Sequence, residues 1–179
     1  VGAGLNDDGG SNSGSAYIFV RSGSSWSQQA KLTASDAAEL DQFGTWVSID
    51  GDYAIVSAHG ENGTAGSAYI FVRSGSSWSQ QAKLTASDAY ASDEFGYSVS
   101  ISGEYAIIGA PKDDDGGSES GSAYIFKRSG TSWSQQAKLV ADDDAAGDWF
   151  GMGVSIDGDY AVVGCWQCHT GGTANTGAA

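Results

Sequence analysis

The sequence predicts an all-β fold built from four-stranded antiparallel units, and three observations support this prediction. The 179 residues include 27 glycines but only one proline, together with six tryptophans and eight tyrosines. This composition is typical of short, aromatic-rich strands joined by tight turns. The chain also repeats itself, and strand-like alternation recurs at the same places in each repeat. We therefore expect little helix.

The internal repeat sets the size of one unit. The phrase SGSSWSQQAKL, with one Ser-to-Thr change in its last copy, occurs three times and places its tryptophan at Trp26, Trp78 and Trp133. A second phrase begins with Phe-Gly and ends in Tyr-Ala, and its copies start at Phe43, Phe95 and Phe150. The repeat is about 52 residues long, which suits a four-stranded unit.

Each unit is expected to contain two hairpins in succession. In the second unit, residues 47–49 (VSI) and 53–56 (YAIV) flank an Asp-Gly turn, which predicts the first hairpin. Residues 67–72 (SAYIFV) and 77–84 (SWSQQAKL) flank the turn Arg-Ser-Gly-Ser and predict the second. The unit is therefore an antiparallel meander, and its repeated Trp, Tyr and Phe side chains are expected to pack between neighbouring sheets.

The Phe-Gly phrase, the triplet GAP at 109–111 and the acidic loop after it resemble the FG-GAP repeats of integrin-α-like β-propellers. The resemblance covers essentially the whole chain. It implies propeller-type blades with calcium in the loop between the second and third strands of a blade. The expected organisation is a single domain, 1–179, made of a half-blade at 1–42, blades at 43–94 and 95–149, and a half-blade at 150–179.

This arrangement gives about three blades, whereas propellers typically have four or more. Two explanations remain open. The chain is a fragment of a larger ring, or its half-blades are completed between molecules. In the second case an open head-to-tail contact would generate a filament, and an unpaired half-blade would leave strand edges exposed.

Two acidic loops are candidate calcium sites. Alternating carboxylates on a glycine-containing loop place several hard oxygens around one point, as Ca²⁺ requires. In the register that the family resemblance suggests, the third unit offers Asp113, Asp115 and Glu119, and the opening segment offers Asn6, Asp8 and Asn12. The alternative is a solvated acidic turn. The loop of the second unit is shorter and lacks the aspartate run, and there His59 stands at the position of Pro111.

The last unit departs from the repeat at 165–169, Cys-Trp-Gln-Cys-His, which contains the only two cysteines of the chain. The C-x-x-C-H arrangement resembles the attachment motif of c-type haem. The resemblance implies that the thiols of Cys165 and Cys168 add to the two vinyl groups of haem, while His169 binds the iron. The competing interpretations are a Cys165–Cys168 disulfide, a zinc site that would need His59 as a fourth ligand, and a thioredoxin-like redox site, which lacks its βαβ context.

His59 is the favoured sixth iron ligand, supplied from the same molecule or from a neighbour, and Met152 is the alternative. His59 is the only other histidine, and in repeat register it lies on the same rim as the haem motif; Met152 is the only methionine and lies on the strand paired with the one before Cys165. An open iron site would allow peroxidase-like chemistry. Trp46, Trp149 and Trp166 depart from the repeat and could either cover a haem or pack generically.

The leading function hypothesis is electron transfer by an extracytoplasmic mono-haem c-type cytochrome on a calcium-binding scaffold, rather than enzymatic catalysis. The alternative is a non-enzymatic adhesion or structural module closed by the disulfide. A net charge of −14 disfavours nucleic acid and anionic lipid as partners, and no apolar run is long enough to span a membrane. The expected partners are a redox protein or neighbouring copies of the chain, in a periplasmic or extracellular location.

Overall fold

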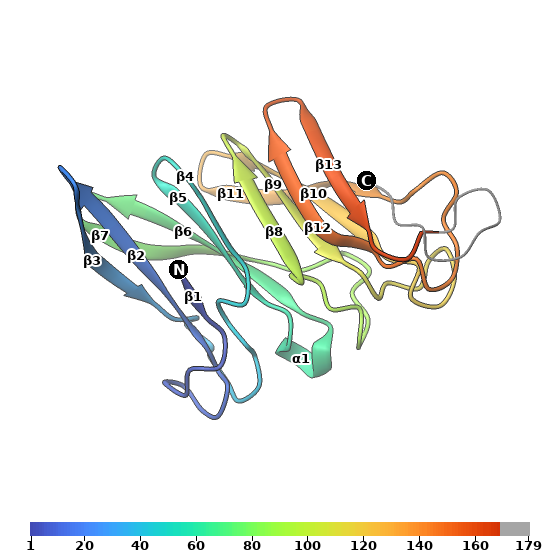
Figure 1. Cartoon of the computed structure of the whole chain (residues 1–179), viewed down its shortest axis with the longest axis horizontal. Helices are drawn as coiled ribbons and strands as arrows, with labels where there is room; N and C mark the ends of the chain where they lie inside the picture. The colour runs from blue at the N-terminus through green and yellow to red at the C-terminus, as the bar shows by residue number, and fades with distance from the viewer. Residues whose placement is uncertain (169–179) are drawn as a thin grey trace.

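The structure is a computed structural model that describes residues 1–168, and it confirms the predicted all-β fold. Residues 1–168 form four antiparallel sheets arranged one after another, as Figure 1 shows from blue to red. The first sheet holds β1 (Gly2–Ala3), β2 (Ser15–Ser22) and β3 (Ser25–Leu32). The second holds β4 (Val47–Asp50), β5 (Tyr53–Ala58), β6 (Ser67–Ser74) and β7 (Ser77–Leu84).

The third sheet repeats the arrangement of the second, and the fourth sheet consists of two strands that are equivalent to the first two strands of each. The third holds β8 (Ser98–Ser102), β9 (Tyr105–Ala110), β10 (Ser122–Ser129) and β11 (Ser132–Leu139). The fourth holds β12 (Phe150–Asp157) and β13 (Tyr160–Cys165). In each four-stranded sheet the strands follow chain order, so both predicted hairpins form and join into a meander.

Three hydrophobic clusters lie between successive sheets and hold them together. The repeated aromatic residues supply their centres, as predicted. Phe43 meets Tyr69 edge to face at 5.5 Å between ring centroids, and Phe95 meets Tyr124 in the same way at 5.4 Å. Trp26 differs from its repeat equivalents, because it is exposed while Trp78 and Trp133 pack against the clusters.

The glycine of the Phe-Gly phrase is required by a close backbone contact. Gly96 has φ +92°, and a Cβ placed on it would lie 2.5 Å from the carbonyl oxygen of Ser67. Only glycine fits such an approach between a loop and the neighbouring strand without strain. The phrase therefore marks the place where the loop leading into one sheet meets a strand of the previous sheet.

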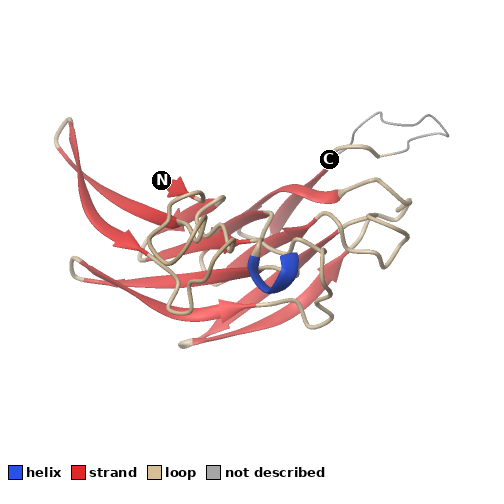
Figure 2. Cartoon of the chain, turned by 90° about the horizontal axis from the view of Figure 1, so that it is seen from below, coloured by secondary structure: helices blue, strands red, loops and turns tan. Residues whose placement is uncertain are grey.

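One short helix, α1 (Glu61–Thr64), forms within the described residues, in the loop of the second unit where no helix was predicted. Figure 2 shows it among the connecting loops, outside the strands. Glu61 in this helix is buried. Its carboxylate takes the position that an aspartate carboxylate has in the acidic loop of the third unit, as described below.

Candidate functional site

Cys165 ends β13 and continues the core pattern of the blades. Its repeat equivalents are Ala58 and Ala110, which are fully buried, and Cys165 is buried as well. The chain then turns back, so that Cys168 lies beside it. The two sulfurs form a disulfide with the Cα atoms 5.5 Å apart, which is within the ordinary range for a disulfide.

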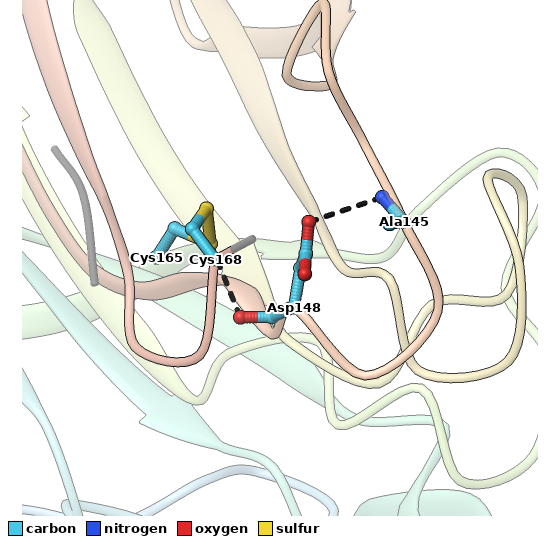
Figure 3. The surroundings of a disulfide bond; sticks show 4 residues. All are labelled: Ala145, Asp148, Cys165 and Cys168. Carbon is cyan, nitrogen blue, oxygen red and sulfur yellow. Dashed lines mark hydrogen bonds between the residues drawn. A yellow bond between two sulfur atoms is a disulfide. The ribbon is translucent and has the colours of Figure 1, made fainter. Parts of the chain in front are cut away.

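Asp148 lies next to this disulfide (Figure 3). It accepts hydrogen bonds both from the cysteine segment and from the turn that precedes Asp148 itself. Its carbonyl oxygen accepts a hydrogen bond from the backbone N–H of Gln167 at 3.1 Å and lies 3.1 Å from Cys165 Sγ. Its carboxylate accepts a hydrogen bond from the backbone N–H of Ala145 at 3.0 Å. Asp41 and Asp93 cap the corresponding turns in the same way, so the Asp148 side chain has a structural function that the repeat explains.

Two tryptophans border the cysteine segment. Trp149 and Trp166 meet edge to face at 5.8 Å, and the indole N–H of Trp149 donates to Glu119 Oε2 at 3.1 Å. Trp166 is largely exposed. Of the three tryptophans that could cover a haem, Trp149 and Trp166 therefore lie at the motif, whereas Trp46 precedes β4 in the second sheet.

The candidate iron ligands are only partly brought together. His169 lies outside the described residues. Met152 lies in a β-bulge of β12, between Phe150, which pairs with Cys165, and Gly153, which pairs with Gly164. The methionine is thus close in register to the disulfide.

His59 lies farther from the cysteines of its own chain. It follows β5, and its ring contacts Tyr97 edge to face at 5.8 Å. The third sheet lies between β5 and β13 (Figure 1), so the zinc set that requires His59 is not assembled within one molecule. Burial lowers the pKa of His59, and its Nδ1 is buried without a hydrogen-bond partner among residues 1–168.

The acidic loop of the third unit surrounds a lysine that sequence reasoning missed. Lys138 Nζ donates to Asp88 Oδ2 at 2.8 Å and to Asp113 Oδ2 at 2.9 Å, and it also pairs with Asp115. The Tyr124 hydroxyl donates to Asp113 Oδ2 at 2.6 Å. Burial alone would lower the pKa of Lys138, but its three carboxylate partners outweigh burial and raise the pKa above its usual value.

The same arrangement recurs in the second unit with a different acid. Glu61 takes the position of Asp113, accepts a hydrogen bond from the Tyr69 hydroxyl at 3.0 Å and pairs with Lys83. Lys83 also pairs with Asp36 at 2.7 Å. The lysine of the repeated phrase QQAKL and the tyrosine of SAYIF were the available signal, since each phrase occurs three times at the repeat spacing.

The opening loop is a more exposed version of this arrangement. Asp8 pairs with Lys31, and Asn6 Oδ1 accepts a hydrogen bond from the backbone N–H of Asp8 at 3.0 Å. Asn12 contributes its backbone N–H, which donates to Asp7 Oδ1 at 2.8 Å. The predicted ligands of this loop therefore lie on one turn.

The donor set of the third unit suits calcium in part. One carboxylate oxygen each from Asp88, Asp113 and Asp115 lies within 4.8 Å of the others, and hard oxygens are the ligands Ca²⁺ prefers. Glu119 does not join them, because its carboxylate accepts the indole N–H of Trp149. The Lys138 ammonium already lies among the three oxygens, so a calcium ion would have to displace it.

The described chain is thus an all-β repeat protein of propeller-type blades, with a disulfide at the end of its last strand. A scan against family models matches the FG-GAP repeat at residues 26–71, 78–126 and 133–179. The chain belongs to the FG-GAP repeat family. A search of curated proteins finds no relative that matches it. Of the helices in the described residues, none is long and apolar enough to cross a membrane.

Proposed function

We propose that this FG-GAP module carries one c-type haem, attached through Cys165 and Cys168 with His169 as an iron ligand, and serves in electron transfer rather than as an enzyme. The observation that supports the proposal most is the position of the two sulfurs. They lie in bonding contact within a single turn at the end of β13, and His169 follows directly in sequence. Two thiols so placed can reach neighbouring positions on one porphyrin edge.

The chemistry of attachment requires free thiols. A thiol reductant must first give the disulfide two electrons and two protons, becoming a disulfide itself, and each S–H of the chain then adds across one vinyl group of haem. When bound, haem supplies a one-electron iron couple. The residues of this chain would hold the sulfur links, supply the His169 imidazole and shield one side of the group with Trp149 and Trp166.

Two sources of a sixth ligand remain within this proposal. Met152 is favoured as a ligand from the same chain, since it lies in the β12 bulge opposite Cys165. His59 would have to come from a neighbouring copy, since the third sheet separates it from the cysteines of its own chain. Methionine ligation would give the higher reduction potential of the two, and without either ligand the iron would be open to small molecules.

The test is expression with an export signal in a host that attaches c-type haem, beside the variant Cys165→Ala/Cys168→Ala. The expected result is an intact mass increased by one haem and a Soret band that stays with the wild-type protein after acid extraction. The variant should show neither. A wild-type mass lower by two hydrogens than that of the reduced chain, with no Soret band, would instead support the second candidate.

That second candidate is a non-enzymatic adhesion or structural module closed by the Cys165–Cys168 disulfide. The disulfide in the structure favours it directly. Disulfides persist in oxidising compartments, so both candidates place the chain in the periplasm or outside the cell. The partners we propose are a redox protein for the first candidate and neighbouring copies of the chain for both, with assembly into an oligomer or filament.

Calcium is proposed as a structural ion of the acidic loops. Asp113 and Asp115 would hold it in the third unit with help from Asp88, at the expense of their contacts with Lys138. Asn6, Asp8 and Asn12 would form the equivalent site in the opening loop. Glu119 would join the third-unit site only by releasing Trp149.

A further inference from the structure

The outer edge of β2 is mostly unpaired within the described residues. In the second sheet, β5 pairs with β6 along its whole length, from Tyr53 opposite Val72 to Ala58 opposite Ser67. The third sheet repeats this pairing. In the first sheet, only Ser15, Ala16 and Tyr17 of β2 are covered on this edge, the first two by β1 and Tyr17 by two backbone hydrogen bonds that it exchanges with Val1. The backbone beyond them, as far as Val20, has the open edge that normally invites another strand.

The side chains beside this edge are exposed where their repeat equivalents are buried. Phe19 is 42% exposed, whereas Phe71 is 3% exposed. Ile49 on β4 is 56% exposed, whereas Ile101 is 5% exposed. An apolar groove runs between the two strands and includes Val47 in its lining. The residue types and the strand register are the same in these sheets. The difference in exposed fraction therefore reflects a neighbouring pair of strands that is missing beside β2 among the described residues.

The far end of the chain has the complementary surface. Val162 on β13 is 52% exposed, whereas its equivalents Ile55 and Ile107 are fully buried. Tyr160 is 83% exposed, whereas Tyr53 is covered by the Arg128 guanidinium 4.4 Å from its ring centre. The sheet β12–β13 therefore has the first two strands of a blade and lacks the third among the described residues.

We propose that the sheet β12–β13 of a second copy occupies the groove beside β2 and completes the first blade. The register follows from the complete blades. Tyr160 would pair with Val20 and Val162 with Ile18, as Tyr53 pairs with Val72 and Ile55 with Ile70. The partner is a second copy because β12–β13 repeats the sequence of the two hairpins, β4–β5 and β8–β9, that fill this position in the complete blades.

Charged groups on the two surfaces match in the same register. In the second sheet Arg73 pairs with Asp52, and in the third Arg128 pairs with Glu104 at 3.9 Å. The equivalents in the incomplete sheets are Arg21 on β2 and Asp159 before β13. Neither has an ion-pair partner within residues 1–168, so the completed blade would join Arg21 of one copy to Asp159 of the next.

Hydrogen bonds between the first strands of successive sheets also agree with this register. The backbone N–H of Ile101 donates to Ser48 Oγ at 3.3 Å, and that of Ile156 donates to Ser100 Oγ at 3.3 Å. By the same rule, the N–H of Ile49 would donate to Ser155 Oγ of the second copy. Hydrogen bonds, an ion pair and apolar burial thus point to one register.

β1 occupies part of the site and would be displaced. Gly2 and Ala3 stand opposite Ala16 and Ser15, the positions that Gly164 and Cys165 of the second copy would take. The two backbone hydrogen bonds between Val1 and Tyr17 would also be exchanged, for pairing of Tyr17 with Val163 of the second copy. β1 is two residues long and exposed or half-buried, so its replacement by the six-residue β13 gains backbone pairing. The contact joins two different surfaces, the groove beside β2 and the sheet β12–β13. Each added copy therefore leaves one groove and one β12–β13 sheet free at the two ends, and the product is a head-to-tail chain.

This inference deepens the oligomer part of the proposed function and rests on that part alone. It does not depend on whether Cys165 and Cys168 carry a haem. The tests are therefore arranged so that a protein without haem can still assemble. Absence of a Soret band would reject the cytochrome proposal, and absence of assembly would reject this one.

The first test uses disulfide cross-linking in a Cys165→Ala/Cys168→Ala background. Introduced together, Ile18→Cys and Val162→Cys should give a ladder of cross-linked oligomers under mild oxidation. The register control, Val20→Cys with Val162→Cys, should give about tenfold less, as expected when the wrong pair costs about 1.4 kcal/mol. Equal yields in both pairs, no cross-link, or a cross-link confined to monomers, which would mean closure within one molecule, each overturn the proposal.

The second test uses charge reversal with the native cysteines retained. Arg21→Glu and Asp159→Arg should each reduce assembly measured by light scattering, since each places like charges at the junction. Mixing the two variants should restore assembly, because every junction then contains one acid and one base. A mixture no more assembled than its components would overturn the proposed register, and so would wild-type protein that stays monomeric at roughly 1 mM, a concentration that half-populates a contact of about −4 kcal/mol.

Discussion

Lys138 Nζ lies 2.9 Å from Asp113 Oδ2, and this contact joins the fourth strand of the third sheet to the loop between its second and third strands. Lys83 and Glu61 make the equivalent contact one sheet earlier, and Lys31 and Asp8 make a related one in the first sheet. The lysine thereby offsets part of the charge of each acidic loop. In the third unit this internal cation lies where the proposed calcium ion would bind.

Lys138→Met should destabilise the protein. The substitution leaves Asp113 buried without its ammonium partner, and breaking such a pair costs roughly 2–4 kcal/mol. Lys31→Met is the matched control. Lys31 and Asp8 are each more than a third exposed, so their contact contributes about 0–1 kcal/mol. Urea denaturation measures both, and equal losses would contradict the importance of the buried pair.

Calcium should stabilise Lys138→Met more than the wild-type protein. In the variant the ion no longer competes with an ammonium group for Asp113 and Asp115, and stabilisation by a ligand grows with its affinity for the folded state. Thermal denaturation with and without added calcium measures the effect. Asp113→Asn should reduce the response in both backgrounds to the part contributed by the opening loop, and so remove the difference between them. If neither protein responds to calcium, the third-unit site is not a calcium site.

Acid should destabilise the fold through Asp88. Burial would raise its pKa, but hydrogen bonds from Lys138 and Tyr124 outweigh burial and hold the pKa below its usual value. The stabilisation from Asp88 is then present above the unfolded pKa of about 4 and is lost as pH falls through the lower folded value. Asp88→Asn should flatten the dependence of the free energy of unfolding on pH below about pH 4.

The pH experiment needs that variant because other aspartates act with the opposite sign. Burial raises the pKa of Asp93, so its contribution to stability falls as pH rises between its unfolded and folded pKa values. The difference between wild type and Asp88→Asn isolates one group. A difference that does not change with pH would contradict the assignment.

The fold could be predicted from the sequence because its local signals agree with one another. The first hairpin of the second unit forms and its strands pair as predicted, but Asp50 is still in the strand opposite Tyr53, so the two turn residues are Gly51 and Asp52. Gly51, the first of them, has φ +55°, a backbone conformation that favours glycine. The bulge between Ile70 and Phe71 was not predicted. Nothing in an alternating apolar pattern reveals one extra residue, because the bulge depends on pairing with the neighbouring strand.

The site was less predictable for a related reason. Sequence spacing correctly placed Cys165 beside Cys168, since residues three apart on one turn lie close together. It could not show that Lys138 and Asp113, 25 positions apart, share one pocket with Asp88. Nor could it show that a whole sheet separates His59 from Cys165, because repeat register gives the rim on which a residue lies but not the distance along that rim.

Gly96→Ala should cost far more stability than Gly103→Ala. Both glycines have positive φ, so alanine is strained by about 1–2 kcal/mol at either position. At Gly103 a new Cβ meets no atom within 4 Å, whereas at Gly96 it would lie 2.5 Å from the Ser67 carbonyl oxygen. The overlap forces the loop and the strand apart and adds roughly 1–3 kcal/mol. Similar urea midpoints for the two variants would show that the sheets do not approach as closely as described.

Cys165→Ala should be well tolerated. The substitution restores the residue found at Ala58 and Ala110, both fully buried at the same strand end, so it leaves a cavity no larger than one sulfur atom. Loss of the disulfide adds a modest cost, because the loop it closes is short, and loop-closure entropy gives about 2 kcal/mol for so few residues. The free energy of unfolding should therefore fall by about 2–3 kcal/mol with the fold retained. Circular dichroism and urea denaturation check this expectation, with Ala110→Cys as a control that introduces the same side chain at the same position of a complete blade. Unfolding of Cys165→Ala alone would mean that the cysteine segment, rather than the sheets, holds the last two strands in place.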